Sequence, residues 1–245
     1  MQTILYEKQR QIAKIYLNRP EKRNAINRAM IADISEAFSL AAADTDVDLV
    51  ILAGAGEKAF SAGFDLKEYE QFGRLDVEQA RCLVMEEAEF IHQIAFFPKP
   101  VIAQVHGYCI GGGVWIALAC DLIVASAEAT FGQPESLLGD SPEFLLEMWK
   151  MPYNKMNEWL FTGKFYTAQE MVQMGVINQI ASFAGLPQAT LGLAEQVLKV
   201  ERGTMRYLKF TISRCYELCR KLDCMNLSQE FFIQNTLYHQ SIPQK

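Results

Sequence analysis

Apolar residues follow two different periods along the first half of the chain. Alternation of apolar and polar residues is typical of a half-buried strand, whereas recurrence every three or four positions is typical of an amphipathic helix. Short runs of β-branched and other apolar residues are typical of fully buried strands. These rules predict strands at residues 3–6, 12–17, 49–53, 101–105 and 122–125, and helices at residues 26–41, 77–94 and 114–120.

From residue 153 onward the pattern is almost entirely helical. Thr167 and Glu170 stand three positions apart at the start of one such segment, which is the pattern of a helix capping box. Strands joined by crossover helices and followed by a run of helices predict an α/β core with an α-helical C-terminal region. We place the core at residues 1–185 and the helical region at residues 186–245. The helices predicted in this half are residues 155–161, 167–174, 187–198, 203–222 and 227–240.

The composition is that of an ordinary globular protein, since half of the 245 residues are apolar and the net charge is −6. An acidic chain lacks the basic field that holds nucleic acid, so no nucleic-acid partner is expected. No apolar run reaches the roughly 18–20 residues of a membrane helix. The N-terminus also lacks the basic and then apolar pattern of a signal peptide. We therefore expect a cytoplasmic protein that has no membrane segment.

The six cysteines form no pattern that is typical of a metal site. None belongs to a Cys-x-x-Cys pair, and His239 is the one histidine near the late cysteines that could complete a zinc site. We expect buried, reduced thiols and no bound metal. The cysteines are Cys82, Cys109, Cys120, Cys215, Cys219 and Cys224.

Two glycine-bearing turns follow predicted strands. One contains Gly63 and follows the strand at residues 49–53, and the other contains Gly111–Gly113 and follows the strand at residues 101–105. Such a turn is either a tight connection under close packing or a place where unpaired N–H groups hold an anion or a developing oxyanion. The sequence lacks the dinucleotide, P-loop and serine-hydrolase glycine motifs, which argues against those three classes.

Carboxylates gather in an irregular, proline-bearing stretch after the strand at residues 122–125. Glu135 ends a Gln-Pro-Glu turn, and Glu143 follows eight residues later. A carboxyl group in a partly apolar pocket has a raised pKa and can carry a proton near neutral pH. The alternative is an acid that caps a helix or faces solvent, and the pattern alone leaves both interpretations open.

In order and spacing, these segments resemble the enoyl-CoA hydratase/isomerase, or crotonase, superfamily over about residues 1–180. The resemblance implies an α/β fold, a crotonase-like spiral of ββα units with an α-helical C-terminal trimerisation region. It implies an enzyme that binds an acyl-CoA and stabilises the enolate of its thioester, without a cofactor because coenzyme A is part of the substrate. An acyl carrier protein is an alternative carrier of the thioester. The matching segments are Asn18–Pro20, Asn24-Ala25, Phe60–Leu66, Pro98–Gly107, Gly111–Gly113, Cys120-Asp121, Phe131–Glu135 and Leu160–Gly163.

By register with that family, Phe64 and Gly112 supply the two backbone N–H groups of an oxyanion hole. Such preorganised donors suit this chemistry, because negative charge develops on the thioester oxygen. Lys67 has two interpretations, a contact with a phosphate of coenzyme A or a solvated side chain. The residues expected to bind the substrate in the loop after Gly63 are Ala62, Asp65, Leu66 and Lys67.

The departures from the family pattern bear on the reaction. Family hydratases use two glutamates, of which the second is present here as Glu135 while the first is replaced by Trp115. An indole cannot activate water as a base, so Trp115 is expected to form part of the substrate pocket or the core. Some isomerases of the family carry an acid at the position of Glu143, and a related dehalogenase branch carries its aspartate nucleophile there.

We therefore predict an enzyme that moves a carbon–carbon double bond of an acyl thioester, with Glu135 and Glu143 as the catalytic acids or bases. The alternatives are a hydratase or dehydratase that uses Glu135, a decarboxylase, and a non-catalytic acyl-CoA binder. The family resemblance also implies a homotrimer or hexamer. The apolar residues of the last helices that favour such an interface are Met205, Leu208, Ile212, Tyr216, Phe231, Phe232 and Leu237.

Overall fold

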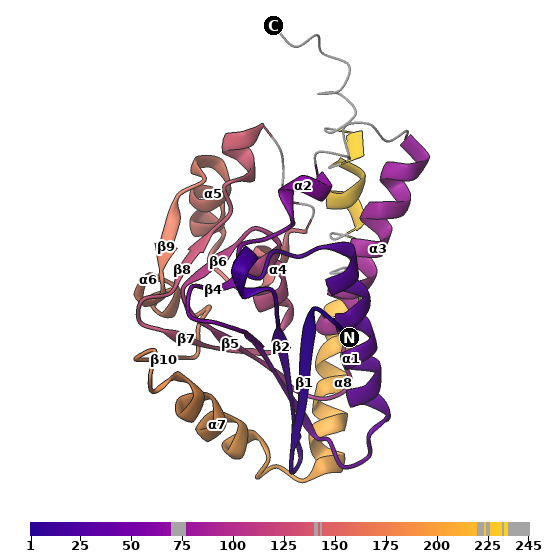
Figure 1. Ribbon diagram of the computed structural model, residues 1–245, viewed down its shortest axis with the longest axis vertical. Coiled ribbons are helices and arrows are strands. Elements are labelled where there is room, and N and C mark those ends of the chain that lie inside the picture. The colour runs from indigo at the N-terminus through magenta and orange to yellow at the C-terminus, as the bar shows by residue number, and fades with distance from the viewer. Residues whose placement is uncertain are drawn as a thin grey trace, which may run out of the picture.

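The residues that the structure describes form two sheets (Figure 1). The computed structural model describes residues 1–69, 77–139, 142, 144–219, 223, 226–231 and 233–234. The larger sheet has the strand order β1-β2-β3-β5-β7-β10 and is parallel except for the β1–β2 hairpin. Its strands are β1 (Ile4–Gln9), β2 (Ile12–Leu17), β3 (Leu49–Gly54), β5 (Val101–Val105), β7 (Leu122–Ser126) and β10 (Gln179–Ala181).

The smaller sheet has the order β4-β6-β8-β9, and its first three strands are parallel. The strands β3, β5 and β7 of the larger sheet are each followed along the chain by one of these three. The carboxyl ends of parallel neighbours lie at the same edge of a sheet, so the segments after β4, β6 and β8 meet there. The strands of the smaller sheet are β4 (Ala59–Ser61), β6 (Tyr108–Ile110), β8 (Thr130–Gly132) and β9 (Phe165–Thr167).

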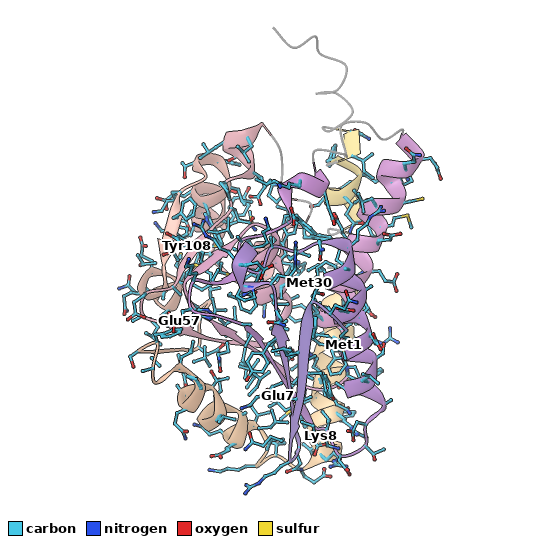
Figure 2. All side chains as sticks on the ribbon, viewed as in Figure 1. Met1, Glu7, Lys8, Met30, Glu57 and Tyr108 are labelled. Atoms are coloured by element: carbon cyan, nitrogen blue, oxygen red, sulfur yellow. The ribbon has the colours of Figure 1, made fainter. Side chains whose placement is uncertain are left out.

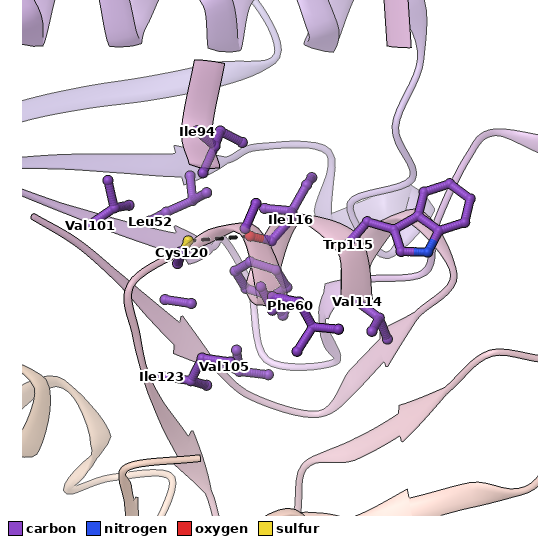
Figure 3. Close-up of a cluster of buried hydrophobic side chains, with 14 of the residues drawn as sticks. Leu52, Phe60, Ile94, Val101, Val105, Val114, Trp115, Ile116, Cys120 and Ile123 are labelled. Carbon is purple, nitrogen blue, oxygen red and sulfur yellow. Dashed lines mark hydrogen bonds between the residues drawn. The ribbon is translucent and has the colours of Figure 1, made fainter. Parts of the chain in front are cut away.

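Helices cover both faces of the larger sheet. Alternate residues of β3 point to opposite faces: Val50 and Leu52 join the main core, and Leu49 and Ile51 pack in a second core against α7. Figure 3 shows Leu52, with side chains of β5 and β7, packed beside α4 in the main core. The named helices of the described residues are α1 (Arg28–Ala43), α2 (Leu66–Tyr69), α3 (Val77–Ala95), α4 (Gly112–Ala119), α5 (Tyr153–Thr162), α6 (Ala168–Gln173), α7 (Leu186–Val197) and α8 (Arg202–Leu218). The 3-10 turns described are η1 (Pro20–Lys22), η3 (Glu135–Leu138) and η4 (Leu146–Trp149).

Side-chain contacts at the ends of elements hold this arrangement. At the lower end of β1 in Figure 2, Lys8 Nζ lies 2.7 Å from Asp44 Oδ2, which ties the strand to the end of α1. The predicted capping box is confirmed, because Thr167 and Glu170 exchange both of its hydrogen bonds at the start of α6.

The predicted strands and helices of the first half are confirmed, with ends that move by a few residues. The region after residue 153 was predicted almost entirely helical, and this is wrong at β9 and β10. Strands of three residues are too short to show alternation, and pairing with the neighbouring strands β8 and β7 decides their conformation. The last predicted helix, residues 227–240, is confirmed at residues 227–231 and 233–234, and its other positions lie outside the described residues. The boundary near residue 185 stays a prediction.

The prediction of buried thiols is only half right. Cys109 and Cys120 are buried, and burial raises the pKa of both thiols. Three cysteines are exposed: Cys82 on the outer face of α3, Cys215 in the last turns of α8, and Cys219 directly after α8. Cys224 lies outside the described residues. Among the helices of the described ranges, none is long and apolar enough to cross a membrane.

Candidate active site

The segment before α1 fixes the first glycine-bearing turn. Asn24 is fully buried, and its side-chain amide donates to the carbonyl oxygens of Ala55 (2.9 Å) and Ala59 (2.8 Å) at the two ends of the β3–β4 connection. The Ser61 hydroxyl donates to Asn24 O (2.8 Å) and accepts from Gly63 N (3.2 Å). These buried hydrogen bonds hold the backbone after β4 in one conformation.

Ile26 sets the direction of the Phe64 peptide group. Ile26 N donates to Gly63 O and Asp65 N donates to Ile26 O, both at 2.8 Å, so that Ile26 and Phe64 form a parallel bridge. In such a bridge the neighbours of the central residue bond to the partner, and its own N–H points to the other side. The Phe64 N–H is therefore directed away from Ile26.

The second turn lies against the first. Gly112 is the first residue of α4, so its N–H has no acceptor inside the helix. A Cβ atom at Gly63 would lie 3.4 Å from Gly112 N and 3.0 Å from Ile110 O. The geometry thus brings together the two backbone segments that carry the expected oxyanion-hole donors, Phe64 and Gly112.

Each glycine of the triplet faces a different part of the site. A Cβ atom at Gly111 would lie 2.7 Å from Glu135 Oε1, one at Gly112 would lie 2.8 Å from the Phe64 ring, and one at Gly113 would lie 2.7 Å from Ser61 O. Gly111 also has φ +52° and ψ −122°, a conformation that other residues rarely adopt. The three glycines are needed because the end of β4 with its following turn and the Glu135 side chain approach the start of α4 closely.

Glu135 enters the site from the end of β8. Gly111 N donates to Gly132 O at 2.9 Å, which fixes β8 beside the start of α4. The next residues form the Gln-Pro-Glu turn, and Glu135 begins η3. Its side chain is half-buried, its Oε2 atom is shielded from solvent, and its Oε1 atom lies over Gly111. A carboxylate at this place can take a proton from a molecule held over the two glycine turns.

Trp115 forms an aromatic wall one helical turn after Gly111. Its ring centroid is 5.8 Å from that of Phe64 and 5.1 Å from that of Phe144, and the residue is 2% exposed. Figure 3 shows the indole turned away from the side chains of β3, β5 and β7. Its Nε1–H has no hydrogen-bond partner within the described part of the chain. Trp115 therefore places an aromatic ring between Phe64 and Phe144, at the position where the family pattern has its first glutamate.

The other predicted binding residues line the outer part of the first turn. Asp65 is half-buried, and its Oδ2 atom accepts from Arg19 Nη2 at 3.0 Å, so its carboxylate is already paired. Leu66 and Lys67 are exposed at the start of α2, and Ala62 is half-buried beside them. This placement leaves Leu66 and Lys67 accessible to a ligand. Glu143 lies outside the described residues, so its role stays a prediction.

Sequence reasoning missed Glu147. This residue of η4 is fully buried, and its Oε1 atom accepts from Gln133 Nε2 at 2.7 Å. Burial raises the pKa of Glu147 to about 7, and the charge of Glu135 contributes to the increase. The signal was an acid inside the apolar run Phe144–Trp149. No group of three metal-ligating side chains occurs among the residues that the structure describes.

The arrangement can stabilise an enolate and move a proton. Two backbone N–H groups from facing turns can hold a thioester oxygen as it becomes negative, and a carboxylate stands beside them. The Trp115 ring packs against the Phe64 side chain of the first turn. This combination suits removal of a proton from a carbon next to a thioester carbonyl.

Comparison with known proteins agrees with this geometry. The family model described as enoyl-CoA hydratase/isomerase matches residues 7–242. A Dictyostelium discoideum protein described as "probable enoyl-CoA hydratase, mitochondrial" is 33% identical over 217 residues, which cover 86% of this chain and 76% of that protein.

Solved structures show the same fold. A probable enoyl-CoA hydratase from Mycobacterium smegmatis has a TM-score of 0.90 and 31% identity, and the match covers 99% of this chain and 98% of that one. An enoyl-CoA hydratase/isomerase from Xanthobacter autotrophicus has a TM-score of 0.89 and 31% identity, with 95% and 87% of the two chains covered. The predicted crotonase-like fold is confirmed, and the chain belongs to the enoyl-CoA hydratase/isomerase family.

Proposed function

We propose that this protein is an isomerase that moves the carbon–carbon double bond of an unsaturated acyl-CoA. The observation that carries the proposal is the place of Trp115, which stands between Phe64 and Phe144 where family hydratases have their first glutamate. The sequence of α4, Gly-Gly-Val-Trp-Ile-Ala-Leu-Ala, holds no group that titrates. Glu135, whose Oε1 atom lies over Gly111, is then the proposed acid/base, because Asp65 of the first turn is paired with Arg19.

In the proposed reaction, the thioester oxygen accepts hydrogen bonds from the N–H groups of Phe64 and Gly112. Glu135 removes a proton from the α carbon of a β,γ-unsaturated thioester, and the electron pair delocalises to the oxygen as a dienolate. The same carboxyl group then returns the proton to the γ carbon, and the double bond comes to lie between the α and β carbons. Loss of one such backbone donor typically costs about 3 kcal/mol of transition-state stabilisation.

Hydration or dehydration is the second candidate. The relatives described as probable enoyl-CoA hydratases favour it. In that reaction Glu135 would handle the water, with Glu143 as a second acid or base. A decarboxylase, a thioester on an acyl carrier protein and a non-catalytic acyl-CoA binder are the further alternatives.

A panel of α,β- and β,γ-unsaturated acyl-CoA thioesters, analysed by mass spectrometry and ultraviolet absorbance, distinguishes these candidates. Isomerisation leaves the mass unchanged and alters the absorbance of the conjugated thioester, whereas hydration adds the mass of one water. We expect isomerisation, lost by a factor of roughly 10²–10⁴ in Glu135→Gln. Glu195→Gln on α7 is the matched control, because that exposed side chain lies outside the site. Product heavier by one water as the main outcome would favour the hydratase.

A further inference from the structure

Glu147 is a buried acid that has few partners for its charge. Its side chain is 0% exposed, and Gln133 Nε2, at 2.7 Å, is the one side-chain donor among the described residues that reaches it. Its other oxygen, Oε2, is buried and has no hydrogen-bond partner among the described residues, and no ion pair there includes Glu147. A fully buried carboxylate normally needs a cation or several donors. These surroundings favour the protonated, uncharged form.

Gln133 connects this acid to the proposed base. Gln133 is 1% exposed and stands two residues before Glu135 in the Gln-Pro-Glu turn, so the hydrogen bond to Glu147 fixes the turn from which Glu135 acts. Glu147 lies twelve positions further along the chain than Glu135, in η4. Gln133 thus connects the two acids: its side chain binds the Glu147 carboxyl group, and its backbone leads within two residues to Glu135.

Within the described part of the chain, the neighbouring charge that acts on Glu147 is that of Glu135. Helix α4, which packs against η4, carries no titratable residue. Helix α5 also packs there, and its Lys155 and Glu158 pair with each other at 2.8 Å. Lys150, just after η4, donates to Cys120 O at 3.0 Å. Burial first and the Glu135 charge second raise the pKa of Glu147 to about 7.

Two coupled carboxyl groups titrate as a pair. Glu135 is half-buried and opens toward the glycine turns, whereas Glu147 is enclosed. Burial disfavours the charged form of Glu147, so its carboxyl group keeps its proton to higher pH than an exposed glutamate does. Ionisation of Glu147 at higher pH places a second negative charge near Glu135 and makes Glu135 a stronger base.

We propose that Glu147 is a positioning residue for Glu135, which stays protonated while Glu135 is ionised and holds the Gln-Pro-Glu turn through Gln133. The proposal deepens the proposed function, since it rests on Glu135 as the base. It assigns a second carboxyl group to this site, and this group does not need to touch the substrate.

The first test measures the two carboxyl groups without any reaction. Carbon-13 at the glutamate side-chain carboxyl carbons is followed by NMR from pH 4 to pH 9 in the wild type, Glu147→Gln, Glu135→Gln and the control Glu195→Gln. We expect one carboxyl signal with a midpoint near pH 7 that disappears in Glu147→Gln. Its midpoint should move to lower pH in Glu135→Gln, because the neighbouring charge is gone. A midpoint that does not move in Glu135→Gln, or a signal that persists in Glu147→Gln, overturns the proposal.

The second test is the pH profile of kcat/KM with the acyl-CoA that the panel identifies. The wild type should show a break near pH 7 that Glu147→Gln lacks, and kcat should change by roughly tenfold, the effect of one pKa unit, while KM stays within about twofold. Circular dichroism verifies the fold. An identical profile in Glu147→Gln contradicts the positioning role while the proposed function stands. Failure of both the wild type and the control Glu195→Gln to turn over any thioester contradicts the proposed function, and the NMR test still decides on Glu147.

Discussion

Removal of the Glu147 carboxyl group should change how stability depends on pH. Burial and the Glu135 charge raise the pKa of Glu147 from 4.5 to about 7 in the folded protein. Between these two values the folded state binds one proton more than the unfolded state, so the free energy of unfolding falls as pH rises. The full shift corresponds to about 3 kcal/mol, since one pKa unit is about 1.4 kcal/mol. Most of this loss, about 2.5 kcal/mol, falls between pH 5 and pH 8.

Glu147→Gln tests this magnitude with little change of shape. The glutamine oxygen can still accept from Gln133 Nε2, and the amide does not titrate. We expect the stability of the variant relative to the wild type to increase by about 2.5 kcal/mol from pH 5 to pH 8. Urea unfolding followed by circular dichroism at four pH values, at one protein concentration, measures the difference, with Glu195→Gln as the control. A difference between variant and wild type that is the same at every pH would refute the reasoning.

Three further predictions follow from the site and from the last helices. Trp115→Glu should cost about 3–5 kcal/mol of stability. In the folded variant we expect lower isomerase activity and a small hydratase activity on crotonyl-CoA, measured by the mass of the product. A wild type that already hydrates crotonyl-CoA rapidly, with no gain in the variant, would contradict the isomerase proposal. Gly111→Ala forces a Cβ atom to within 2.7 Å of Glu135 Oε1 at φ +52°. We expect at least roughly tenfold lower activity, because the carboxylate that acts as the base is displaced. The control Gly192→Ala, whose Cβ atom meets nothing within 4 Å on α7, should keep full activity. Leu208 and Ile212 are exposed on α8, and light scattering at micromolar concentration should give a trimer or hexamer; a mass of one chain would contradict this.

The sequence predicted the elements that have a strong period or a family motif. The long strands and α1 follow directly from their apolar positions, because burial on one or both faces decides their conformation. The motifs around Phe64, Gly112 and Glu135 lie far apart in sequence, and the structure brings them together at one edge of the smaller sheet. Their catalytic roles stay predictions, as does the cytoplasmic location, since the relative from Dictyostelium is described as mitochondrial.

Other features depend on tertiary contacts that no local pattern records. The strand at Gln179–Ala181 exists because β7 offers it hydrogen bonds. Glu147 looks like an ordinary acid of a short turn until its neighbours enclose it. Cys215 follows the helical period of α8 but lies on its exposed face. In each case the neighbouring elements, which the residue's own sequence does not specify, determine the outcome.

The central claim is that Glu135 alone carries the proton from the α carbon to the γ carbon of the bound substrate. The most direct test is whether this proton exchanges with water on the way. A β,γ-unsaturated acyl-CoA is converted in deuterium oxide, and NMR of the first product formed shows which hydrogen isotope the γ carbon received. We predict that much of the product carries ordinary hydrogen there, taken from the α carbon and returned by Glu135 before exchange with solvent, and that Glu135→Gln forms no product. Complete deuteration of the γ carbon, or a main product heavier by one molecule of deuterium oxide, would contradict the central claim.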